Sequence, residues 1–372
     1  MLMVKTEERD FTPADISSKV SVSGKYKHLV FCFLPLLLFV TLALGVLGRG
    51  YWLLLPIAFL LAVLPVLDLV TGWQDNVHFE KSDFSRLEIS LFNWNPRLYA
   101  LLYMAAITWL AMNIRRFTPI EIGLLLVNSS LVAGICFAAA HELLHAKEKI
   151  DQVLQRITTT FLFYPHYKLI HIRSHHVHIG TDHDENTAWL NESIYAYIFR
   201  TIPGSMIRSW QLEARQAGDA STGTGLFRNK MTYYALGQVG LVLALYFLSG
   251  PWGLLFYLAH ILGAHIVLES VNYIQHYGLL RERHEGEYEK TGAEHSWDTY
   301  HFFSSYGTFR VGHHSYHHLA VKPYYLLGTE PQAPRLPVGY LWSMTMVLLP
   351  PWWRRVINPK LKAAAGIPQT IS

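Results

Sequence analysis

The chain has 372 residues, of which 51% are hydrophobic and only 16% are charged. This composition excludes an ordinary soluble protein and is typical of a polytopic membrane protein. The net charge of +4 is small and the basic residues are scattered, which excludes a nucleic-acid-binding surface. The two cysteines, Cys32 and Cys136, lie in apolar runs, so the chain holds neither a disulfide framework nor a four-cysteine iron site.

The first 25 or so residues are polar, and we interpret them as a cytoplasmic tail because they lack the apolar core of a secretory signal. Six apolar runs follow, and runs of about 20 residues are long enough to cross a membrane. Residues 71–97 are predicted to form a polar loop. The short apolar stretch 338–352 contains Pro350 and Pro351, which favours an interfacial segment over a seventh span. The predicted spans are 28–47, 51–70, 98–113, 121–140, 231–248 and 252–271.

Six spans place both termini on one side of the membrane, together with residues 141–230 and 272–372. The other side then keeps only Arg49, Arg115 and Arg116, so the positive-inside rule makes the first side cytoplasmic. No internal linker divides the chain, and we expect a single membrane domain over residues 1–372. The predicted fold is all-α: a polytopic integral membrane protein with six transmembrane helices and a cytoplasmic, histidine-rich helical cap.

Nine of the 20 histidines fall into four short motifs, HELLH, HIRSHH, NYIQHYG and HSYHH. Neutral imidazole is the commonest side-chain ligand of transition metals, and two histidines four residues apart on a helix point the same way. A lone histidine is an ordinary core or surface residue, but four such motifs together predict a metal site. The candidate ligands are His141, His145, His171, His175, His176, His276, His314, His317 and His318.

The last predicted span carries a polar stripe, because His265, Glu269, Asn272 and His276 recur at intervals of four, three and four residues. Ionisable groups at membrane depth are costly and usually face a functional interior. We expect His276 to bind metal and the other three to be partners of the ligands.

The spacing HELLH also occurs in zinc metalloproteases, where the glutamate is the general base. A zinc site of that kind uses three protein ligands, and it would leave HIRSHH and HSYHH without a role. Imidazole ligands alone do not distinguish iron from zinc.

The order of these motifs after four spans resembles the histidine boxes of the membrane-bound alkane monooxygenase family. The segments LESVNYIQHYGLLRE, HSWD at His295 and APRLPVGY near Pro334 extend the resemblance over about residues 123–355. The chain also departs from the family pattern. Ile170 and Ser174 replace the usual Glu and Gly of the second box, Tyr316 replaces the Asp of the fourth, and Gly312-His313 replaces Gln-Arg before it.

The resemblance implies two iron ions held by the nine boxed histidines. It also implies hydroxylation of the terminal methyl group of medium-chain alkanes to 1-alkanols with O2. Electrons would come from NADH through a reductase and a separate rubredoxin, and the protein would lie in the inner membrane of a bacterium. Acidic residues near the boxes, Asp182, Asp184, Glu185, Glu294 and Asp298, could orient ligand rings through their second N–H. The residues that we expect to support the ligands without binding metal themselves are Glu142, Asp184, His265, Glu269 and Asn272.

Three other functions stay open at this point. A related di-iron hydroxylase could act on another alkyl or an aryl-methyl substrate, and a membrane fatty-acyl desaturase uses similar histidine boxes, although it lacks NYIQHYGLLRE and HSWD. A metal transporter should carry polar groups along several spans. Here they concentrate at the ends of the fourth and sixth spans, which disfavours transport.

Overall fold

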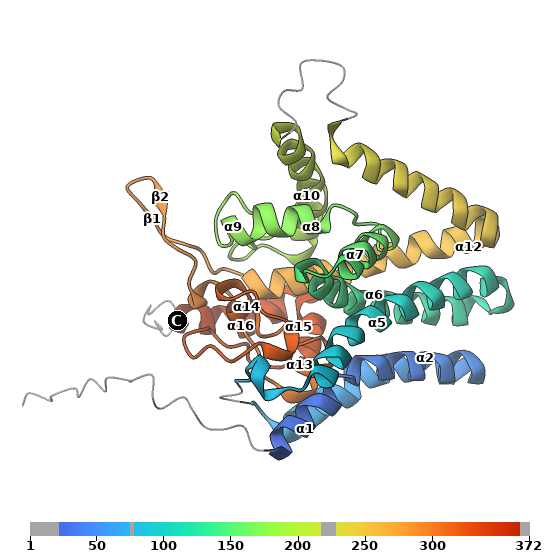
Figure 1. Cartoon of the computed structure of the whole chain (residues 1–372), viewed down its shortest axis with the longest axis horizontal. Coiled ribbons are helices and arrows are strands. Elements are labelled where there is room, and N and C mark those ends of the chain that lie inside the picture. The colour runs from blue at the N-terminus through green and yellow to red at the C-terminus, as the bar shows by residue number, and fades with distance from the viewer. Residues whose placement is uncertain (1–21, 75–77, 217–227, 365–372) are drawn as a thin grey trace, which may run out of the picture.

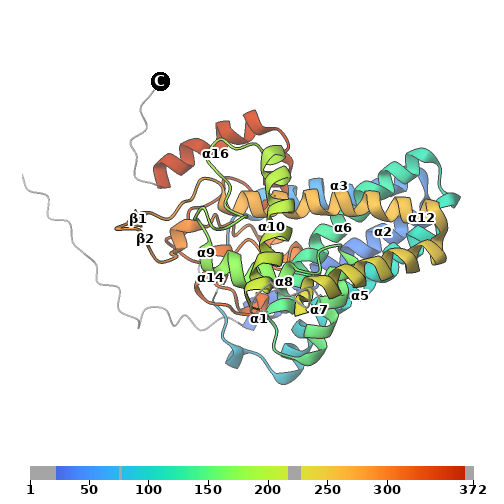
Figure 2. The same ribbon diagram turned by 90° about the horizontal axis from the view of Figure 1, so that it is seen from above.

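The computed structural model describes residues 22–74, 78–216 and 228–364, and the predicted N-terminal tail therefore falls almost entirely outside the described residues. The chain is mostly helical, with one small hairpin (Figures 1 and 2). The helices in chain order are α1 (Val22–Phe31), α2 (Leu37–Gly48), α3 (Leu55–Ala58), α4 (Leu64–Thr71), α5 (Arg86–Asn113), α6 (Pro119–His145), α7 (Lys149–Phe161), α8 (Tyr167–Ile170), α9 (His176–His178), α10 (Ile194–Gln216), α12 (Lys230–His276), α13 (Phe302–Gly307), α14 (His314–Leu319), α15 (Tyr340–Val347) and α16 (Pro350–Ala364).

Five helical stretches in the described part of the chain are long and apolar enough to cross a membrane. They form the elongated half of the molecule, in which α2, α5, α6 and α12 extend in the same direction (Figure 1). The shorter helices and loops gather at the opposite end. These stretches are Gly24–Gly48, Gly50–Thr71, Arg86–Arg116, Pro119–His145 and Lys230–His276.

The 47-residue element α12 covers both of the last two predicted spans. A straight helix of that length would measure about 70 Å, more than twice the hydrocarbon thickness. The element is interrupted at Gly250, whose φ of 68° is left-handed, and its two halves fold back on each other there (Figure 1). Pro251 follows directly and lacks the N–H that a continuous helix needs. The count of six crossings stays a prediction.

The prediction of a loop over residues 71–97 is wrong for its last part, because α5 already begins at Arg86. A capping box starts this helix: Ser85 Oγ accepts from the Glu88 backbone N–H, and Glu88 Oε2 accepts from the Ser85 N–H. The pattern Ser85-x-x-Glu88 marks the start of this helix in the sequence, but the many charged residues of the segment favoured its interpretation as a loop. The third membrane helix is consequently 12 residues longer at its start than the predicted span.

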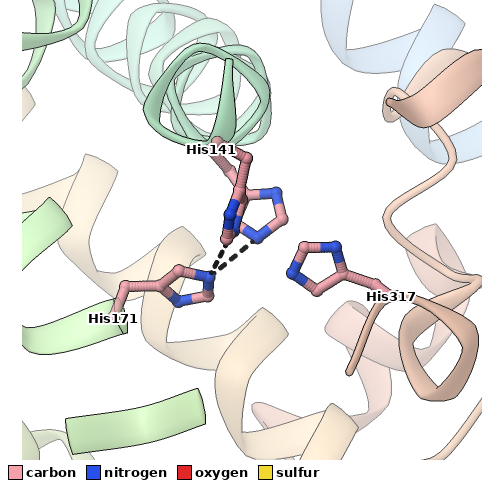
Figure 3. Close-up of side chains that lie close together, drawn as sticks. His141, His171 and His317 are labelled. Carbon is pink, nitrogen blue, oxygen red and sulfur yellow. Dashed lines mark hydrogen bonds between the residues drawn. The ribbon is translucent and has the colours of Figure 1, made fainter. Parts of the chain in front are cut away.

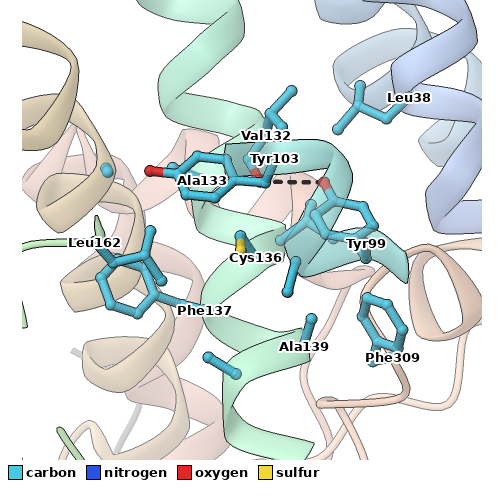
Figure 4. Packing of buried hydrophobic residues seen from close by; sticks show 14 of the residues in the cluster. Leu38, Tyr99, Tyr103, Val132, Ala133, Cys136, Phe137, Ala139, Leu162 and Phe309 are labelled. Carbon is cyan, nitrogen blue, oxygen red and sulfur yellow. Dashed lines mark hydrogen bonds between the residues drawn. The ribbon is translucent and has the colours of Figure 1, made fainter. Parts of the chain in front are cut away.

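The membrane half is held together by close packing of α5, α6 and α12 around a buried core (Figure 4). The hydroxyl of Tyr99 on α5 donates to the carbonyl oxygen of Val132 on α6 at 3.1 Å, which satisfies a polar group inside this core. Gly134 lets α6 approach α12 closely, since a Cβ atom at this position would lie only 2.1 Å from Cγ1 of Val267.

The cap at the other end consists of α7 to α10 and the region after α12. Within the described residues, the cap departs from the all-α prediction in an antiparallel hairpin of two very short strands, β1 (Arg283–His284) and β2 (Glu287–Tyr288). Asp68 near the end of α4 joins the two halves, because its Oδ1 accepts from the backbone N–H groups of Phe303 and Ser304 in α13 at 2.7 and 3.1 Å. The stretch 338–352 forms the short α15 and the start of α16, and it is not among the membrane-spanning helices.

Candidate metal centre

The first histidine cluster forms where α6 leaves the apolar core. His141 and His145 occupy the last turn of α6 and share one face of the helix. His171 comes from a π-helical turn over His171–His175, and His317 comes from α14. These side chains converge from three separate segments (Figure 3). One nitrogen atom from each of the four residues lies within 4.8 Å of those from the other three.

The second cluster lies beside the first and contains His175, His276, His314 and His318, again within 4.8 Å of one another. His276 is the final residue of α12, so the longest apolar helix ends at this cluster. His314 and His318 are four residues apart on α14 and therefore share a face. His314 Nε2 lies 3.0 Å from His276 Nε2 and 3.0 Å from His318 Nε2.

His176 lies beside the first cluster, although it follows His175 directly in the chain. Its Nε2 is 2.9 Å from His171 Nε2 and 3.2 Å from His317 Nε2. In an α-helix, residues five apart point about 140° away from each other. A π turn joins residues five apart, which places His176 over His171. The structure thus brings all nine predicted ligands together.

The nitrogen–nitrogen distances fit metal ligands better than they fit hydrogen bonds. His171 Nε2 has three other Nε2 atoms, of His141, His145 and His176, at 2.9 to 3.1 Å. A ring nitrogen carries either one proton or one lone pair, so it can form only one such hydrogen bond. Two imidazoles bound at about 2.1 Å to one ion, at right angles, place their nitrogens about 3.0 Å apart. The residues present therefore fit a shared ion in each cluster.

Burial also keeps the imidazoles of the cap in the neutral form that binds metal. Loss of hydration lowers the pKa of His171, His314, His317 and His318 well below the ordinary value, and neighbouring imidazoles lower it further. Burial lowers the pKa of His176 to about 3. At neutral pH each of these rings therefore keeps one nitrogen lone pair available to a metal ion.

Two acidic side chains hold the cap side of the centre in place. Asp184 Oδ2 accepts from His175 Nδ1 at 2.9 Å. Asp298 accepts from the backbone N–H of Ser315 at 2.8 Å and from its hydroxyl, and it thereby anchors the start of α14. Burial raises the pKa of Asp298 to about 6.

The other acidic residues near the boxes lie farther from the ligands. Glu185 accepts from the hydroxyl of Ser174, which precedes His175. Asp182 accepts from the hydroxyl of the hairpin residue Tyr288, and Glu294 lies 3.6 Å from His295, which is not a box histidine.

The remaining predicted partners differ in their placement. Glu142 Oε1 lies 3.8 Å from His141 Nδ1, and its Oε2 accepts from the backbone N–H of Tyr324. Glu269 is buried and accepts from Asn272 Nδ2 at 3.3 Å. His265 turns toward the backbone, with its Nε2 3.1 Å from the carbonyl oxygen of Leu162.

An apolar cavity reaches the clusters from the membrane half. It is narrow and partly open to the outside. Its lining is mainly aliphatic side chains of α6, α12 and α15, and it meets the centre at His141, His171, His175 and His314. These wall residues could not be identified from the sequence, because apolar side chains that face a cavity, a core or lipid follow the same pattern.

Comparison with known proteins agrees with this geometry. Residues 119–329, which include all the box histidines, match the fatty acid desaturase family. The alkane 1-monooxygenase of Ectopseudomonas oleovorans is 34% identical over 273 residues, which cover 73% of this chain and 67% of that protein. The alkane 1-monooxygenase of Pseudomonas putida is 31% identical over 323 residues, covering 84% and 79%. The chain belongs to the alkane monooxygenase branch of the fatty acid desaturase family.

A further relative in this branch is the xylene/toluene monooxygenase hydroxylase component XylM of Pseudomonas putida, which is 23% identical over 66% of each chain. Membership confirms the family predicted from the histidine boxes. The chain is an integral membrane hydroxylase, and its two histidine clusters form the di-iron site typical of the family.

Proposed function

We propose that this protein hydroxylates the terminal methyl group of medium-chain alkanes to give 1-alkanols. The observation that supports this most directly is the apolar cavity, which runs from the membrane half to the histidine clusters. An alkane dissolved in the bilayer could enter it laterally and place one end at the centre. The relatives at 34% and 31% identity are named alkane 1-monooxygenases, which agrees with the proposal.

We further propose that the nine box histidines bind two iron ions, which when present supply the oxidising power that no side chain has. The protein's own part is to exclude water from the cavity and to hold the substrate's methyl group at the ligands. Electrons come from NADH through a reductase and a separate rubredoxin. The overall balance is RH + O2 + 2 electrons + 2 H⁺ → ROH + H2O.

The proposed location is the inner membrane of a bacterium, with the termini and the metal centre on the cytoplasmic side. Its support is the charge distribution, because six crossings would leave only Arg49, Arg115 and Arg116 on the far side. We propose that the whole chain forms a single membrane domain with six spans. Its cap consists of residues 141–230 and 272–372.

The test is iron analysis of the purified protein, followed by octane oxidation under 18O2 with NADH, reductase and rubredoxin. Two irons per chain and labelled 1-octanol are the expected result. Labelled benzyl alcohol from toluene without octanol would move the substrate to the aryl-methyl class, and an unlabelled double bond in a fatty-acyl chain would make the protein a desaturase. Bound zinc in an active preparation would contradict the oxygenase mechanism.

Single substitutions test the proposed ligands. His145→Ala, His176→Ala and His317→Ala should each lower bound iron and abolish hydroxylation while the protein stays in the membrane. The matched control is His183→Ala, because His183 is exposed and contacts His178, Asp182 and Tyr288, none of which is a proposed ligand. Full activity in one of the three variants would remove that residue from the ligand set.

A further inference from the structure

A second cleft, separate from the apolar cavity, reaches the first histidine cluster at His145. It encloses about 1000 Å³ of empty space, part of it open, and its inner end is formed by Glu142 and His145. Three exposed lysines, Lys81, Lys147 and Lys322, line its mouth, and we call it the lysine-rimmed cleft. It shares no lining residue with the apolar cavity. The metal centre is therefore approached by two separate routes.

The two routes differ in chemistry. The apolar cavity meets the centre at His141, His171, His175 and His314. Its other walls are mainly apolar, and their polar side chains are Tyr167, Asn272, Gln275, Thr308 and Tyr340. The lysine-rimmed cleft carries more charged side chains: its lining includes Lys81, Glu142, Lys147, Asp151 and Lys322 among apolar residues. Lys322 Nζ donates to the Tyr316 hydroxyl at 2.9 Å, and the Glu142 carboxylate accepts from the Tyr324 N–H at 2.8 Å. Water occupies a space that is roomy and offers two to four polar partners, and it avoids an apolar one.

The proposed reaction requires a route of this kind. One C–H bond and the O–O bond break, and one C–O bond and three O–H bonds form, so two protons enter and one water molecule leaves for each turnover. Water in the hydrocarbon cavity would compete with the substrate and would carry a desolvation cost there. We propose that the lysine-rimmed cleft is the aqueous port of the metal centre, through which water and protons exchange while the hydrocarbon uses the apolar cavity. The inference rests on the proposed function.

Cysteine labelling tests the port without any need for turnover. The two native cysteines, Cys32 and Cys136, are buried, so background labelling is low. Asn93→Cys places a thiol on the cleft wall and Val271→Cys places one on the cavity wall. The anionic reagent sulfonatoethyl methanethiosulfonate should label Asn93→Cys at least about tenfold faster, because a fixed charge is excluded from an apolar space. Neutral benzyl methanethiosulfonate should label both. If the anionic reagent labels the two variants at the same rate, the lysine-rimmed cleft is not the aqueous port.

A second experiment measures turnover in variants at two exposed lysines, one on the rim of the cleft and one outside it. Lys322→Cys lies on the rim of the cleft, and Lys149→Cys lies on the nearby surface outside it. After modification with a bulky maleimide, the first variant should turn over several-fold more slowly with an unchanged KM for octane, and the second should be unaffected. A raised KM for octane in the first variant, or no loss at all, would contradict the proposal. If unmodified variants oxidise no hydrocarbon while the labelling pattern holds, the proposed function fails and the port stands.

Discussion

Asp184 contacts a box histidine directly, and both side chains are buried. Because Asp184 accepts from Nδ1 of His175, it fixes the proton on that nitrogen and leaves the Nε2 lone pair free for the second cluster. Asp184 Oδ1 also accepts from the backbone N–H of Asn186, so the carboxylate itself cannot rotate away. The orientation of one ligand thus depends on a residue nine positions along the chain.

Asp184→Asn should lower the affinity for iron by about ten- to a hundredfold, because a neutral amide binds and orients the imidazole less firmly. The measurement is iron retained per chain during titration with a chelator. Asp182→Asn is the matched control, since this neighbouring aspartate is exposed and contacts the hairpin residue Tyr288. Equal retention in the two variants would show that Asp184 does not support the site.

Motif spacing predicted that the histidines gather, since eight of the nine share a motif with another, one helical turn away or adjacent. It could not predict that His175 would join the second cluster while His176 lies beside the first, because that depends on the π turn before them. His265 shows another effect of the tertiary fold. Its place on the polar stripe suggested a ligand partner, yet its ring meets the Leu162 carbonyl, a contact that only the tertiary fold creates.

At the scale of elements, α6 and α12 carry the centre between them, and their spacing depends on small residues. Gly134 faces Val267 across the contact, and both line the apolar cavity. Packing density in such interiors leaves little room for an added methyl group. The same close approach therefore sets both the helix spacing and the width of the cavity.

Gly134→Ala should destabilise the protein by about 1–3 kcal/mol, because the new methyl group overlaps Val267 Cγ1. Thermal unfolding in detergent measures this. Gly123→Ala on the same helix is the control, since a Cβ there meets nothing within 4 Å. Adding Val267→Ala should restore part of the loss, and a double variant less stable than Gly134→Ala would refute the assigned contact.

Helix positions were predictable where apolar runs are long, as in α6, which extends the predicted span 121–140 through HELLH to His145. Helix positions could not be predicted where a helical segment carries several charged residues. Residues 86–97 contain Arg86, Glu88 and Arg97, and the last of these is buried because Asp151 on α7 pairs with it at 2.6 Å. A partner from elsewhere in the chain makes that charge compatible with a buried helix face.

At the scale of the whole molecule, the metal centre joins segments that are distant in sequence. The clusters draw on α6, the turn at His171–His175, α12 and α14, which connect the membrane half to the cap. Neutral imidazoles alone do not hold these segments together, whereas a bound ion links them through its ligands. We therefore expect the cap to be more rigid when metal is bound than when it is absent.

Removal of iron with a chelator should loosen the cap and leave the membrane helices intact. Hydrogen exchange should rise over residues 167–178 and 302–319, and exchange over residues 119–134 should stay slow. Re-addition of iron should reverse the change. Uniform exchange in both forms would show that packing alone holds the cap.

The metal-free protein should also lose stability in acid. Burial holds the pKa of His171, His176, His314, His317 and His318 below 6.5, so the unfolded chain binds more protons than the folded one once the pH falls below that value. Each group contributes up to about 1.4 kcal/mol per pH unit. The unfolding temperature should therefore be nearly constant above pH 7 and fall steeply from pH 6.5 to 5. A flat profile would mean that the imidazoles are hydrated in the metal-free state.

The sharing of α14 between the clusters also sets an order of events during biosynthesis. His317 belongs to one cluster, and His314 and His318 belong to the other. Neither cluster is complete until these last box residues have left the ribosome, when all five long apolar stretches have already been made. Neither metal cluster can therefore be completed before all five long apolar stretches have been synthesised.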